Sequence, residues 1–558
     1  MNNKIFKGLC VGLLGMIALN SCTKLDVKTY SVVGSGSYWQ TPDQITAGVA
    51  PAYGGFNSIS AIDAGIATML ECTADDIVVP TRGNDWGDAG HWDALWKHTY
   101  EKTNSNWNNG WNDIFNAISS CNNIITAVNG IKPAPSSLPV ILAQVKTLRA
   151  YYYFMAMDVF GNIPIVTDTT TSTTSPTKAR ADVFNFIVSE VQSSLPYLTT
   201  TVDASTYGKV TRYFAFALLA RMYLNAQVLT GKPGLSYTAG TPAWQKASDY
   251  CDSILLSNKY SLMSNYFDNF APTNGPSSTE NIFAVVTDHI NNKVSSWENA
   301  ILHYQSYLAF GMSTGANLWN GFCSAADFYN NFDTTSSYAA SGSNTLRTYR
   351  DMRSGQWLIG QQFIGTYNYP PSQNVVVAGP SANYILDAQT GFPLAFNPNF
   401  TLFSDPSAQG RLAGVRNIKY FPSPNSGKSG NDMDNDIIIF RLAEILLIKA
   451  EAQIRLGNPG AALPLVNQLR TRAYGGNSSF NLTTINLTTL LAEKGREMAY
   501  EGVRRDDLIR YEVAGNGDYF TRARVPGKAK DPDQHTMVFP IPAQQMTANS
   551  GLVQNPGY

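Results

Sequence analysis

The clearest alternation of apolar and polar positions in the chain predicts a helical hairpin over residues 440–472. The polar positions of its first helix fall in one narrow arc, formed by Arg441, Glu444, Glu451 and Arg455. Leu, Ile and Ala fill most of the remaining surface, so this helix needs neighbours beyond its hairpin partner. At the connection, Gly457 suits the left-handed C′ position, Asn458 an N-cap and Pro459 the first helical position. Pro464 predicts a late start or a kink in the second helix, because it removes a backbone amide.

Helical spacing recurs at both ends of the chain. We expect further helices at residues 38–57, 106–128, 138–160, 180–198, 211–229, 243–256 and 490–511. Segments 218–227 and 446–455 share a leucine pair followed by an Ala- and Leu-rich stretch. This internal similarity is weak, and it is typical of degenerate tetratricopeptide-like repeats. The pattern therefore predicts a mostly α protein built from helix pairs.

The helical signal collapses between residues 260 and 434, where only 324–332 is clearly helical and 281–286 fits a strand. Residues 74–102 also lose periodicity, and we interpret them as an ordered loop. An irregular stretch as long as 260–434 normally signals function or disorder, and its aromatic residues argue against disorder. We therefore divide the chain into an N-terminal helical region, an irregular ligand-binding insert and a C-terminal helical region, at 37–259, 260–434 and 435–558.

The N-terminus carries a targeting signal. Lys4 and Lys7 precede an apolar segment at residues 8–19, which is too short to span a bilayer as a stable helix. The following Leu-Asn-Ser-Cys sequence resembles the bacterial lipobox and implies cleavage before Cys22, with lipid on that residue. We expect a signal peptide at residues 1–21 and a lipidated tether at 22–36. A secretory peptide cut elsewhere is the alternative.

Charge and composition narrow the class of ligand. The formal net charge is −1, charged residues make up 15% of the chain, and no basic run is present, which argues against nucleic acid. Aromatic residues reach 12%, and the loops are rich in Asn, Gly, Ser and Thr. Aromatic rings beside neutral amides and hydroxyls suit an uncharged polar ligand. Ordinary aromatic cores in a large protein would account for most of the same residues.

Metal and disulfide chemistry receive little support. Four cysteines are widely separated beyond the leader, namely Cys72, Cys121, Cys251 and Cys323, and there are five histidines. A zinc site is therefore unsupported. We expect buried thiols, while one or two disulfides stay open for an exported protein.

Several motifs in a fixed order resemble the SusD/RagB family, the lipoprotein half of glycan-uptake systems in Bacteroidota. Beside the lipobox, they are Leu148-Arg149-Ala150-Tyr151-Tyr152-Tyr153 running into Phe160-Gly161-Asn162-Ile163-Pro164; Arg441-Leu442-Ala443-Glu444 with Ala450-Glu451-Ala452; Glu497-Met498-Ala499-Tyr500-Glu501-Gly502 with Arg504, Arg505, Asp507 and Leu508; and the tail from Phe539-Pro540-Ile541-Pro542 to Gln554-Asn555-Pro556-Gly557-Tyr558. Each motif alone is weak, whereas the ordered set is specific and covers nearly the whole chain.

The resemblance implies a fold, a partner and a location. The fold would be a SusD-like, tetratricopeptide-type α-α superhelix of about four helix pairs, with a large loop-rich insert. The partner would be a SusC-like TonB-dependent transporter, capped by a lipoprotein anchored in the outer membrane and facing the cell exterior. The helical frame would face the transporter, and the ligand site would lie on the solvent side. The fold alone does not identify the ligand.

Mapped onto this sequence, the family's ligand site falls on the loop near residue 80 and on the insert. We predict that Trp86, Trp297 and Trp319 stack on sugar rings, since flat exposed aromatic platforms suit the apolar faces of pyranoses. The predicted polar contacts are Arg82, Asn84 and Asp85, although Arg82 could instead brace the loop. Asn317, Asn320 and Tyr304 are secondary candidates. Core packing is the alternative for every tryptophan, and we expect it for Trp39, Trp92, Trp96, Trp107, Trp111 and Trp244.

Catalytic patterns are present but incomplete. Residues 311–315 match G-x-S-x-G, yet no strand–helix alternation surrounds them, so we interpret them as a loop. A glycosidase needs two carboxylates across a cleft, whereas Glu444 with Glu451, and Glu497 with Glu501, are spaced to form ion pairs that brace helices. The triplet Asp432, Asp434 and Asp436 lacks the glycine and distal glutamate of a calcium loop, and we interpret it as a solvated turn leading to an Asp N-cap.

These observations predict a non-catalytic, cell-surface glycan-binding lipoprotein without cofactor or metal. It would capture a neutral oligosaccharide or polysaccharide and deliver it to the SusC-like transporter. A peptide-binding RagB-like uptake protein, a glycoside hydrolase and an assembly scaffold are the alternatives.

Overall fold

The computed structural model describes residues 39, 41–60, 65–169, 174–294, 296–365, 367, 369–371, 375–423, 425 and 433–558. The predicted signal peptide, Cys22 and the tether lie outside these residues, as does Asp432 of the acidic triplet. Within the described ranges, no helix is both long enough and apolar enough to cross a membrane.

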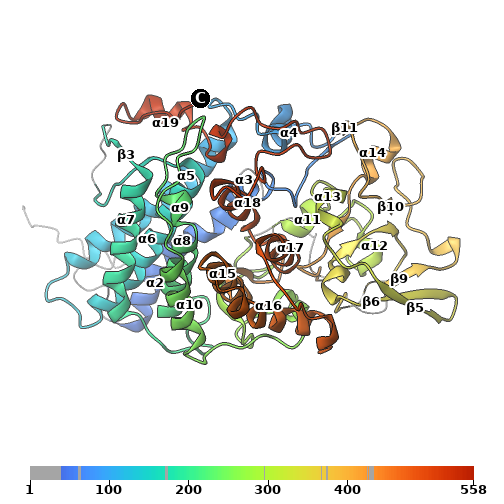
Figure 1. The fold of residues 1–558 in the computed structure, drawn as a ribbon, viewed down its shortest axis with the longest axis horizontal. Helices are drawn as coiled ribbons and strands as arrows, with labels where there is room; N and C mark the ends of the chain where they lie inside the picture. Colours follow the sequence, from blue (N-terminus) through green and yellow to red (C-terminus); the bar gives the residue numbers. More distant parts are fainter. Residues whose placement is uncertain are drawn as a thin grey trace, which may run out of the picture.

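The N-terminal part is a layered array of antiparallel and crossing helices (Figure 1). Its helices are α2 (Pro42–Ser60), α3 (Ile66–Glu71), α4 (His91–Lys97), α5 (Ser105–Asn129), α6 (Leu138–Phe160), α7 (Arg180–Ser194), α8 (Arg212–Leu224), α9 (Ala226–Leu229) and α10 (Trp244–Leu255). α5 packs on α2 and α6, α6 packs on α7, and α8 packs on α10. The central helix α6 is buried on all sides from Thr147 to Phe160, because aromatic and aliphatic residues occupy its whole circumference there.

The C-terminal part supplies α15 (Leu442–Arg455), α16 (Pro459–Ala473), α17 (Leu487–Met498), α18 (Arg504–Val513) and α19 (Ala543–Ala548). α15 packs against α16 and α17 and also against α10 of the N-terminal part. The hairpin predicted from the sequence is therefore the element that joins the two helical parts, and its apolar surface is covered on several sides. The prediction of a mostly α fold built from helix pairs is confirmed.

Three details of this hairpin differ from the prediction. Its first helix begins at Leu442, because residues 437–441 form strand β13 (Ile437–Arg441). The second helix begins at Pro459 and contains Pro464, so the predicted late start is wrong. Asn458 occupies the N-cap position, but its side chain makes no capping hydrogen bond. Gly457 has the predicted left-handed conformation, with φ of 85°.

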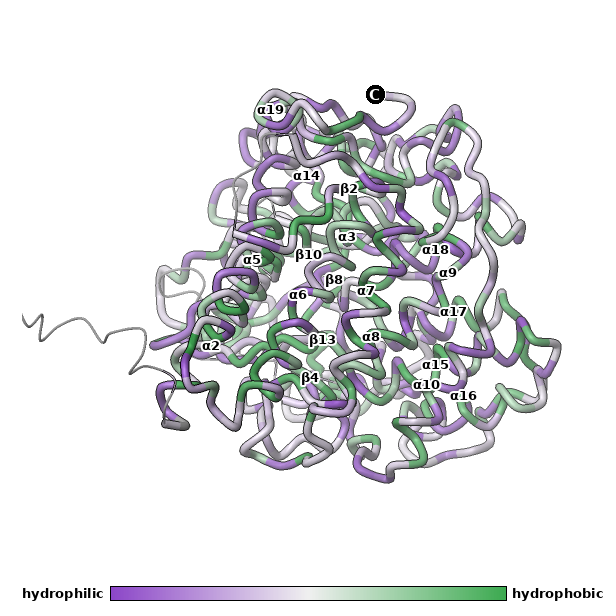
Figure 2. The backbone as a smooth tube through the Cα atoms, turned by 90° about the vertical axis from the view of Figure 1, so that its left-hand side faces the viewer, coloured by the Kyte–Doolittle hydropathy of each residue, from purple (hydrophilic) through white to green (hydrophobic). Residues whose placement is uncertain are grey.

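The insert consists of short helices and strands joined by ordered loops. Its helices are α11 (Trp297–Ile301), α12 (Tyr307–Phe310), α13 (Ala326–Tyr329) and α14 (Ala408–Leu412). Its largest sheet has three antiparallel strands in the order β5 (Ser336–Ser341), β6 (Asn344–Tyr349) and β9 (Val375–Ala378). The predicted strand is β4 (Asn281–Val285), which pairs antiparallel with β13, whereas the predicted helix at 324–332 is shorter, as α13. In Figure 2 the chain is hydrophobic along both β4 and β13.

The other strands are two residues long and pair in twos. They are β1 (Thr81–Arg82) parallel to β11 (Ser404–Asp405), and the antiparallel pairs β2 (Ile163–Pro164) with β3 (Thr177–Lys178), β7 (Trp357–Leu358) with β12 (Arg416–Asn417), and β8 (Gly360–Gln361) with β10 (Ala395–Phe396). The β1–β11 pair ties the N-terminal loop near residue 80 to the far end of the insert. The division at residues 37–259, 260–434 and 435–558 stays a prediction.

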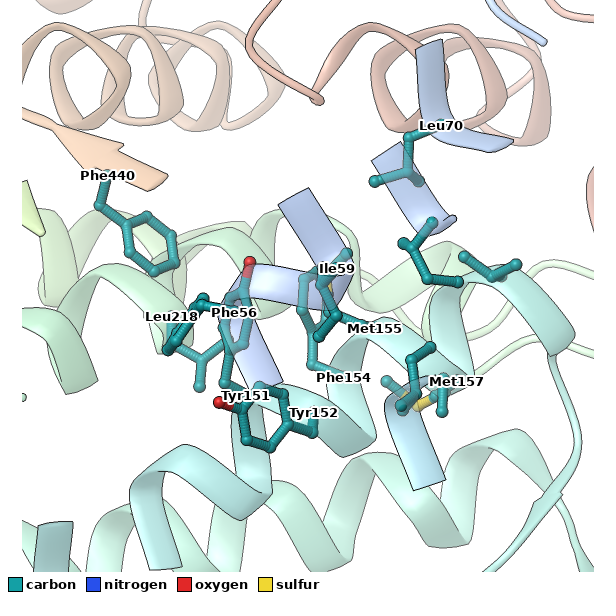
Figure 3. Packing of buried hydrophobic residues seen from close by; sticks show 14 of the residues in the cluster. Phe56, Ile59, Leu70, Tyr151, Tyr152, Phe154, Met155, Met157, Leu218 and Phe440 are labelled. Atoms are coloured by element: carbon teal, nitrogen blue, oxygen red, sulfur yellow. The ribbon is translucent and has the colours of Figure 1, made fainter. Parts of the chain in front are cut away.

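The main hydrophobic core surrounds α6. Tyr151 lies against Phe56 and Phe440, with ring centroids 5.1 and 6.2 Å apart, so α2, α6 and β13 meet at one cluster (Figure 3). A second, smaller core lies inside the insert and includes Leu302, Leu358, Ile385 and Leu394. The insert is therefore held by its own apolar packing, as its aromatic composition predicted.

Buried ion pairs brace the helices at the positions expected from the hairpin sequence. Glu444 pairs with Arg221 of α8 at 2.7 Å, and Glu451 pairs with Arg510 of α18 at 2.6 Å. Glu497 accepts hydrogen bonds from Arg441 and Arg353. The prediction that these glutamates brace helices is confirmed.

Two predictions about polar residues also have clear outcomes. Asp436 precedes a strand rather than a helix, so the predicted N-cap is wrong. Its carboxylate accepts hydrogen bonds from the Thr287 amide and the Tyr207 hydroxyl, both at 2.8 Å. The four cysteines are buried free thiols, as expected.

Candidate functional site

A tight turn at residues 82–85 presents the first group of predicted site residues. The Arg82 amide donates to the Asp85 carbonyl at 2.9 Å, and the Asp85 amide donates back to the Arg82 carbonyl at 3.2 Å. Gly83 occupies the first central position with φ of 66°, as a type II′ turn requires, and Asn84 follows it. The side chains of Asn84 and Asp85 are exposed at this turn.

Arg82 does not reach the surface. Its side chain is fully buried, and its guanidinium donates to the carbonyls of Gly410 and Ala413, both at 3.0 Å, and of Gly321 at 3.1 Å. Burial lowers the pKa of Arg82 from its usual value. The prediction that Arg82 contacts ligand is therefore wrong in this structure, because the carbonyls of two insert loops occupy its donors. Its role is the alternative one, which is to brace the turn.

Two of the three predicted tryptophans lie side by side. The Trp86 indole N–H donates to the Trp319 carbonyl at 2.7 Å, which joins residues 233 positions apart in the sequence. The Trp86 ring lies directly on Gly321, where any Cβ would overlap it. Both tryptophans are half-buried, so part of each ring stays accessible. Trp86 has φ of 61°, a strained conformation for a bulky residue that is typical of functional sites.

Trp297 lies in the interior. It is 8% exposed at the start of α11, and its ring packs against Phe322 and Tyr500, with centroids 5.8 and 6.2 Å away. It also lines a cavity of 80 Å³ between the two helical parts. The prediction of an exposed platform at Trp297 is wrong, because the short helix α11 turns this residue towards the core.

Tyr304 is half-buried beside the turn. Its hydroxyl donates to the Asp85 carboxylate, and the Arg411 guanidinium lies 5.2 Å from its ring centroid. Partial burial and the neighbouring Asp85 raise the pKa of Tyr304, so the phenol stays protonated at neutral pH. Arg411 is itself paired with the buried carboxylate of Asp387, at 2.9 Å. This secondary candidate thus joins the insert, to which it belongs, to the turn.

The two asparagines proposed as secondary contacts differ in position. Asn317 is exposed, and its carbonyl accepts a hydrogen bond from Asn299 at 2.6 Å. Asn320 is buried, donating to the Arg411 carbonyl at 3.0 Å and accepting from Arg416 at 2.7 Å. Asn317 remains available to a ligand, whereas Asn320 holds the loop that carries Trp319.

The predictions for the remaining tryptophans mostly agree with the structure. Trp39, Trp92, Trp96, Trp107 and Trp111 are buried, and Trp244 is half-buried at the start of α10. Trp92 and Trp96 lie on the short helix α4, as their spacing indicated. The ring of Trp92 packs 5.3 Å from that of Trp86 and so supports it from behind.

We call the group formed by Asn84, Asp85, Trp86, Tyr304 and Trp319 the platform; its first two residues are exposed and its three aromatic residues are half-buried. It offers two partly exposed indole rings, a phenol, an amide and a carboxylate, which are groups that stack on and hydrogen-bond to a polar, uncharged ligand. The described residues contain no group of three or more His, Cys, Asp or Glu side chains placed to share a metal ion. Ser313 of the G-x-S-x-G match is exposed in the loop after α12, without the preceding strand that a nucleophile elbow requires.

Models of known protein families match both the N-terminal and the C-terminal part of the chain. The model of the "SusD family" matches residues 279–558, and a model described as "Starch-binding associating with outer membrane" matches residues 55–224.

Individual relatives are similar over most of their length. SusD-like protein P25 of Formosa agariphila is 24% identical, over 79% of this chain and 77% of the relative. Starch-binding protein SusD of Bacteroides thetaiotaomicron is 22% identical, over 75% and 72%. Among solved structures, surface glycan-binding protein A from Bacteroides uniformis superimposes with a TM-score of 0.66 at 18% identity, covering 92% of this chain and 99% of that one. This structural similarity concerns the fold.

Proposed function

The chain belongs to the SusD family, and on that premise we propose that it is a non-catalytic, lipid-anchored surface protein that binds a neutral glycan. It would pass this glycan to a SusC-like TonB-dependent transporter in the outer membrane. The lipid anchor rests on the sequence around Cys22, and the membrane association is supported by the description of the family model that matches residues 55–224.

The single observation that carries the proposal is the pairing of Trp86 with Trp319 beside Tyr304 and Asp85. These residues come from two distant parts of the chain, and a direct hydrogen bond joins the two tryptophans. Apolar sugar faces stack on such rings, while hydroxyl groups bond to the nearby amide and carboxylate. Partly exposed aromatic residues on loops, beside exposed polar groups, support a binding site here.

The charge of the platform favours an uncharged ligand. Asp85 places a carboxylate on the surface, and the neighbouring cation, Arg411, is buried and paired with Asp387. A uronic acid or sulfate group at this place would meet a like charge without an available partner. We therefore propose a neutral polysaccharide or oligosaccharide rather than an acidic one.

Isothermal titration against soluble starch, laminarin, galactomannan and xylan tests this function. We expect one of these glycans to bind and Trp319→Ala to weaken that binding by about 1–3 kcal/mol, by analogy with the stacking of other planar ligands. Tyr197→Ala is the matched control, because Tyr197 is an aromatic residue that is 52% exposed and lies beyond α7. Its binding should equal that of the wild type.

Other outcomes would assign the protein differently. A glycan that binds equally well to the wild type and to Trp319→Ala would remove the platform from the binding site. Affinity for peptides without affinity for any glycan would favour the peptide-uptake alternative. Release of reducing ends on prolonged incubation with the bound glycan would identify a hydrolase instead.

A further inference from the structure

A second concave surface lies beside β1, which leads into the turn at residues 82–85, and we propose that it binds another sugar unit of the same neutral glycan. We call it the cleft. Its lining includes Thr81 of β1, Asn399 and Phe400 from the loop before β11, and Gln409 of α14. The proposal rests on the proposed function, since it takes the ligand class from the platform and extends the binding site.

The size of the cleft suits a small polar ligand. Its volume is 470 Å³, within the range of about 300–1,000 Å³ that is common for ligand pockets. Phe400 is half-buried in it, and Asn399, Thr401 and Gln409 are exposed. The cleft therefore resembles the platform, because both place an aromatic ring beside neutral polar groups that can hydrogen-bond to a sugar.

The polar groups of the cleft are neutral apart from one carboxylate. Asp405 is the charged residue of the lining, and its Oδ1 accepts a hydrogen bond from the Ser407 amide at 2.9 Å. Within the described part of the chain, the side chains of Asn399 and Gln409 have no hydrogen-bond partner. These two amides are therefore available to a ligand, and they can both donate to and accept from hydroxyl groups.

The cleft and the platform share one anchor, the buried Arg82. One nitrogen of its guanidinium donates to the Gly410 and Ala413 carbonyls, which belong to the wall of the cleft. The other nitrogen donates to the carbonyl of Gly321, on which the Trp86 ring rests. The backbone behind the two surfaces is thus joined through one buried guanidinium, which fixes their relative position.

This geometry lets one glycan chain contact both surfaces. Two weak contacts on a single chain act together, because binding at the first raises the effective concentration at the second. The cleft would then increase affinity for a polysaccharide more than for a disaccharide, which can occupy one surface at a time.

The test uses the double variant Asn399→Ala/Gln409→Ala of the full chain. Both side chains are exposed and unpartnered among the described residues, so the variant should fold like the wild type. The matched control is Asn116→Ala/Asn185→Ala, which removes two exposed amides from α5 and α7, on the opposite side of the molecule from α14 (Figure 1). Both variants and Trp319→Ala are titrated with soluble starch, laminarin, galactomannan and xylan, and with the disaccharide of the glycan that binds.

We expect the double variant to lose about tenfold in affinity for the polysaccharide, the value for two hydrogen bonds, while the control stays unchanged. Its affinity for the disaccharide should change less. If the double variant binds the polysaccharide like the wild type while Trp319→Ala binds it more weakly, the cleft is not a binding surface and the proposed function stands. Weaker binding by the double variant, with unchanged binding by Trp319→Ala, would support binding in the cleft and show that the platform does not bind the glycan. If the wild type binds none of the four glycans, both proposals fail.

Discussion

At the scale of single residues, the platform depends on a side chain that no ligand touches. Arg82 is fully buried, and the carbonyls of Gly321, Gly410 and Ala413 all accept hydrogen bonds from it. A buried donor with several acceptors is costly to remove. The Gly410 and Ala413 carbonyls would keep the Ala413 amide and Arg416 as donors, whereas the Gly321 carbonyl would lose its donor. Arg82 thus holds the turn at residues 82–85 against the insert through hydrogen bonds to insert carbonyls.

We expect Arg82→Met to lower the free energy of unfolding by roughly 2–4 kcal/mol, because it removes several buried hydrogen bonds and takes from the Gly321 carbonyl its donor. Urea denaturation followed by tryptophan fluorescence measures the change. Arg350→Met is the control, since Arg350 pairs with Asp333 and its side chain is 42% exposed, so its removal should cost less than about 1 kcal/mol. Equal effects of the two substitutions would show that Arg82 does not brace the turn.

Trp297 leads to a different prediction from Trp319. Trp297→Ala should lower the free energy of unfolding by about 3–5 kcal/mol, because it empties space in a packed core. The folded fraction of this variant should bind glycan with the affinity of the wild type. Denaturation and glycan titration of the same preparation separate the effect on stability from the effect on binding. A loss of affinity without a loss of stability would show that Trp297 contacts the glycan.

The sequence could not distinguish these tryptophans. Trp297 and Trp319 both stand among Ser, Asn and Gly, which correctly indicates a lack of long helices. Local composition does not reveal towards which side a ring points. The five-residue helix α11 turns the Trp297 ring towards the core. The hydrogen bond from the Trp86 indole to the Trp319 carbonyl holds Trp319 beside Trp86. Trp86, Asn84 and Asp85 were predicted from the family resemblance, and the exposure of Asn84 and Asp85 agrees with their place in a glycine-containing turn.

At the scale of elements, the turn at residues 82–85 needs a glycine in one place only. Gly83 has φ of 66°, whereas Gly87 has φ of −74°. A Cβ at Gly83 would meet open space, so its cost comes from the backbone alone, and a Cβ at Gly87 would make ordinary contact with Thr81 at 3.9 Å. The two positions form a natural pair for substitution.

We expect Gly83→Ala to destabilise the protein by about 1–2 kcal/mol and to weaken glycan binding, because alanine disfavours the left-handed conformation and shifts Asn84 and Asp85. Gly87→Ala should be neutral or slightly stabilising, since it restricts the unfolded chain. Thermal unfolding and titration of both variants measure these effects. The idea is wrong if Gly83→Ala binds and melts like Gly87→Ala.

Elements differ in how well the sequence predicts them. The long helices α5, α6 and α15 were predicted within a few residues, because their periodicity extends over several turns. β13 was interpreted as part of a helix, since a short apolar run such as Ile-Ile-Ile-Phe fits a buried strand or a helix equally well. The β1–β11 pair could not be predicted, because it joins segments more than 300 residues apart. The cleft lies beside this pair and was missed for the same reason.

At the scale of the whole molecule, buried charges connect the insert to the C-terminal helices. Arg441 pairs with Glu280 at 2.8 Å and with Glu497 of α17 at 2.7 Å. Arg353 of the insert pairs with Glu493 and Glu497 of the same helix, at 2.9 and 3.1 Å. These pairs cross between elements that lie far apart in the sequence. Their ionisation therefore affects how the frame and the insert hold together.

Glu493 of this network and Glu451 of α15 have depressed pKa values. Although burial opposes ionisation, Arg353, Arg496 and Arg470 lower the pKa of Glu493 to about 2. Arg510 and Arg455 likewise lower that of Glu451 to about 2 against burial. Burial acts in the opposite direction on Asp76 and Asp436, where it raises the pKa of each to about 6. The two groups of carboxyls therefore respond to acid in opposite ways.

The sign of each effect follows from proton binding. The unfolded chain binds a proton at Glu493 near its ordinary pKa of 4.5, well before the folded protein does, so the stability from this residue is present above pH 4.5 and is lost between about 4.5 and 2. Asp76 and Asp436 take up protons first in the folded protein, near pH 6, and so stabilise it as the pH falls towards their ordinary value of 3.8. The stability gained from protonating Asp76 and Asp436 between about pH 6 and 3.8 offsets the first part of the stability lost at Glu493. We therefore expect the steep decline of stability to begin only below about pH 4.5.

Glu493→Gln isolates the contribution of the network. At pH 7 this variant should unfold at lower free energy than the wild type, by on the order of 3 kcal/mol for a pKa shift of this size. The difference should shrink between about pH 4.5 and 2, because the wild type protonates Glu493 over that range. Asp518→Asn is the control, since Asp518 forms an exposed pair with Lys530, and its difference from the wild type should be small at every pH. Denaturation series at pH 7, 4.5 and 3 measure both variants. A Glu493→Gln deficit that stays constant from pH 7 to 3 would mean that its cost comes from packing, and the network would not control the response of the protein to acid.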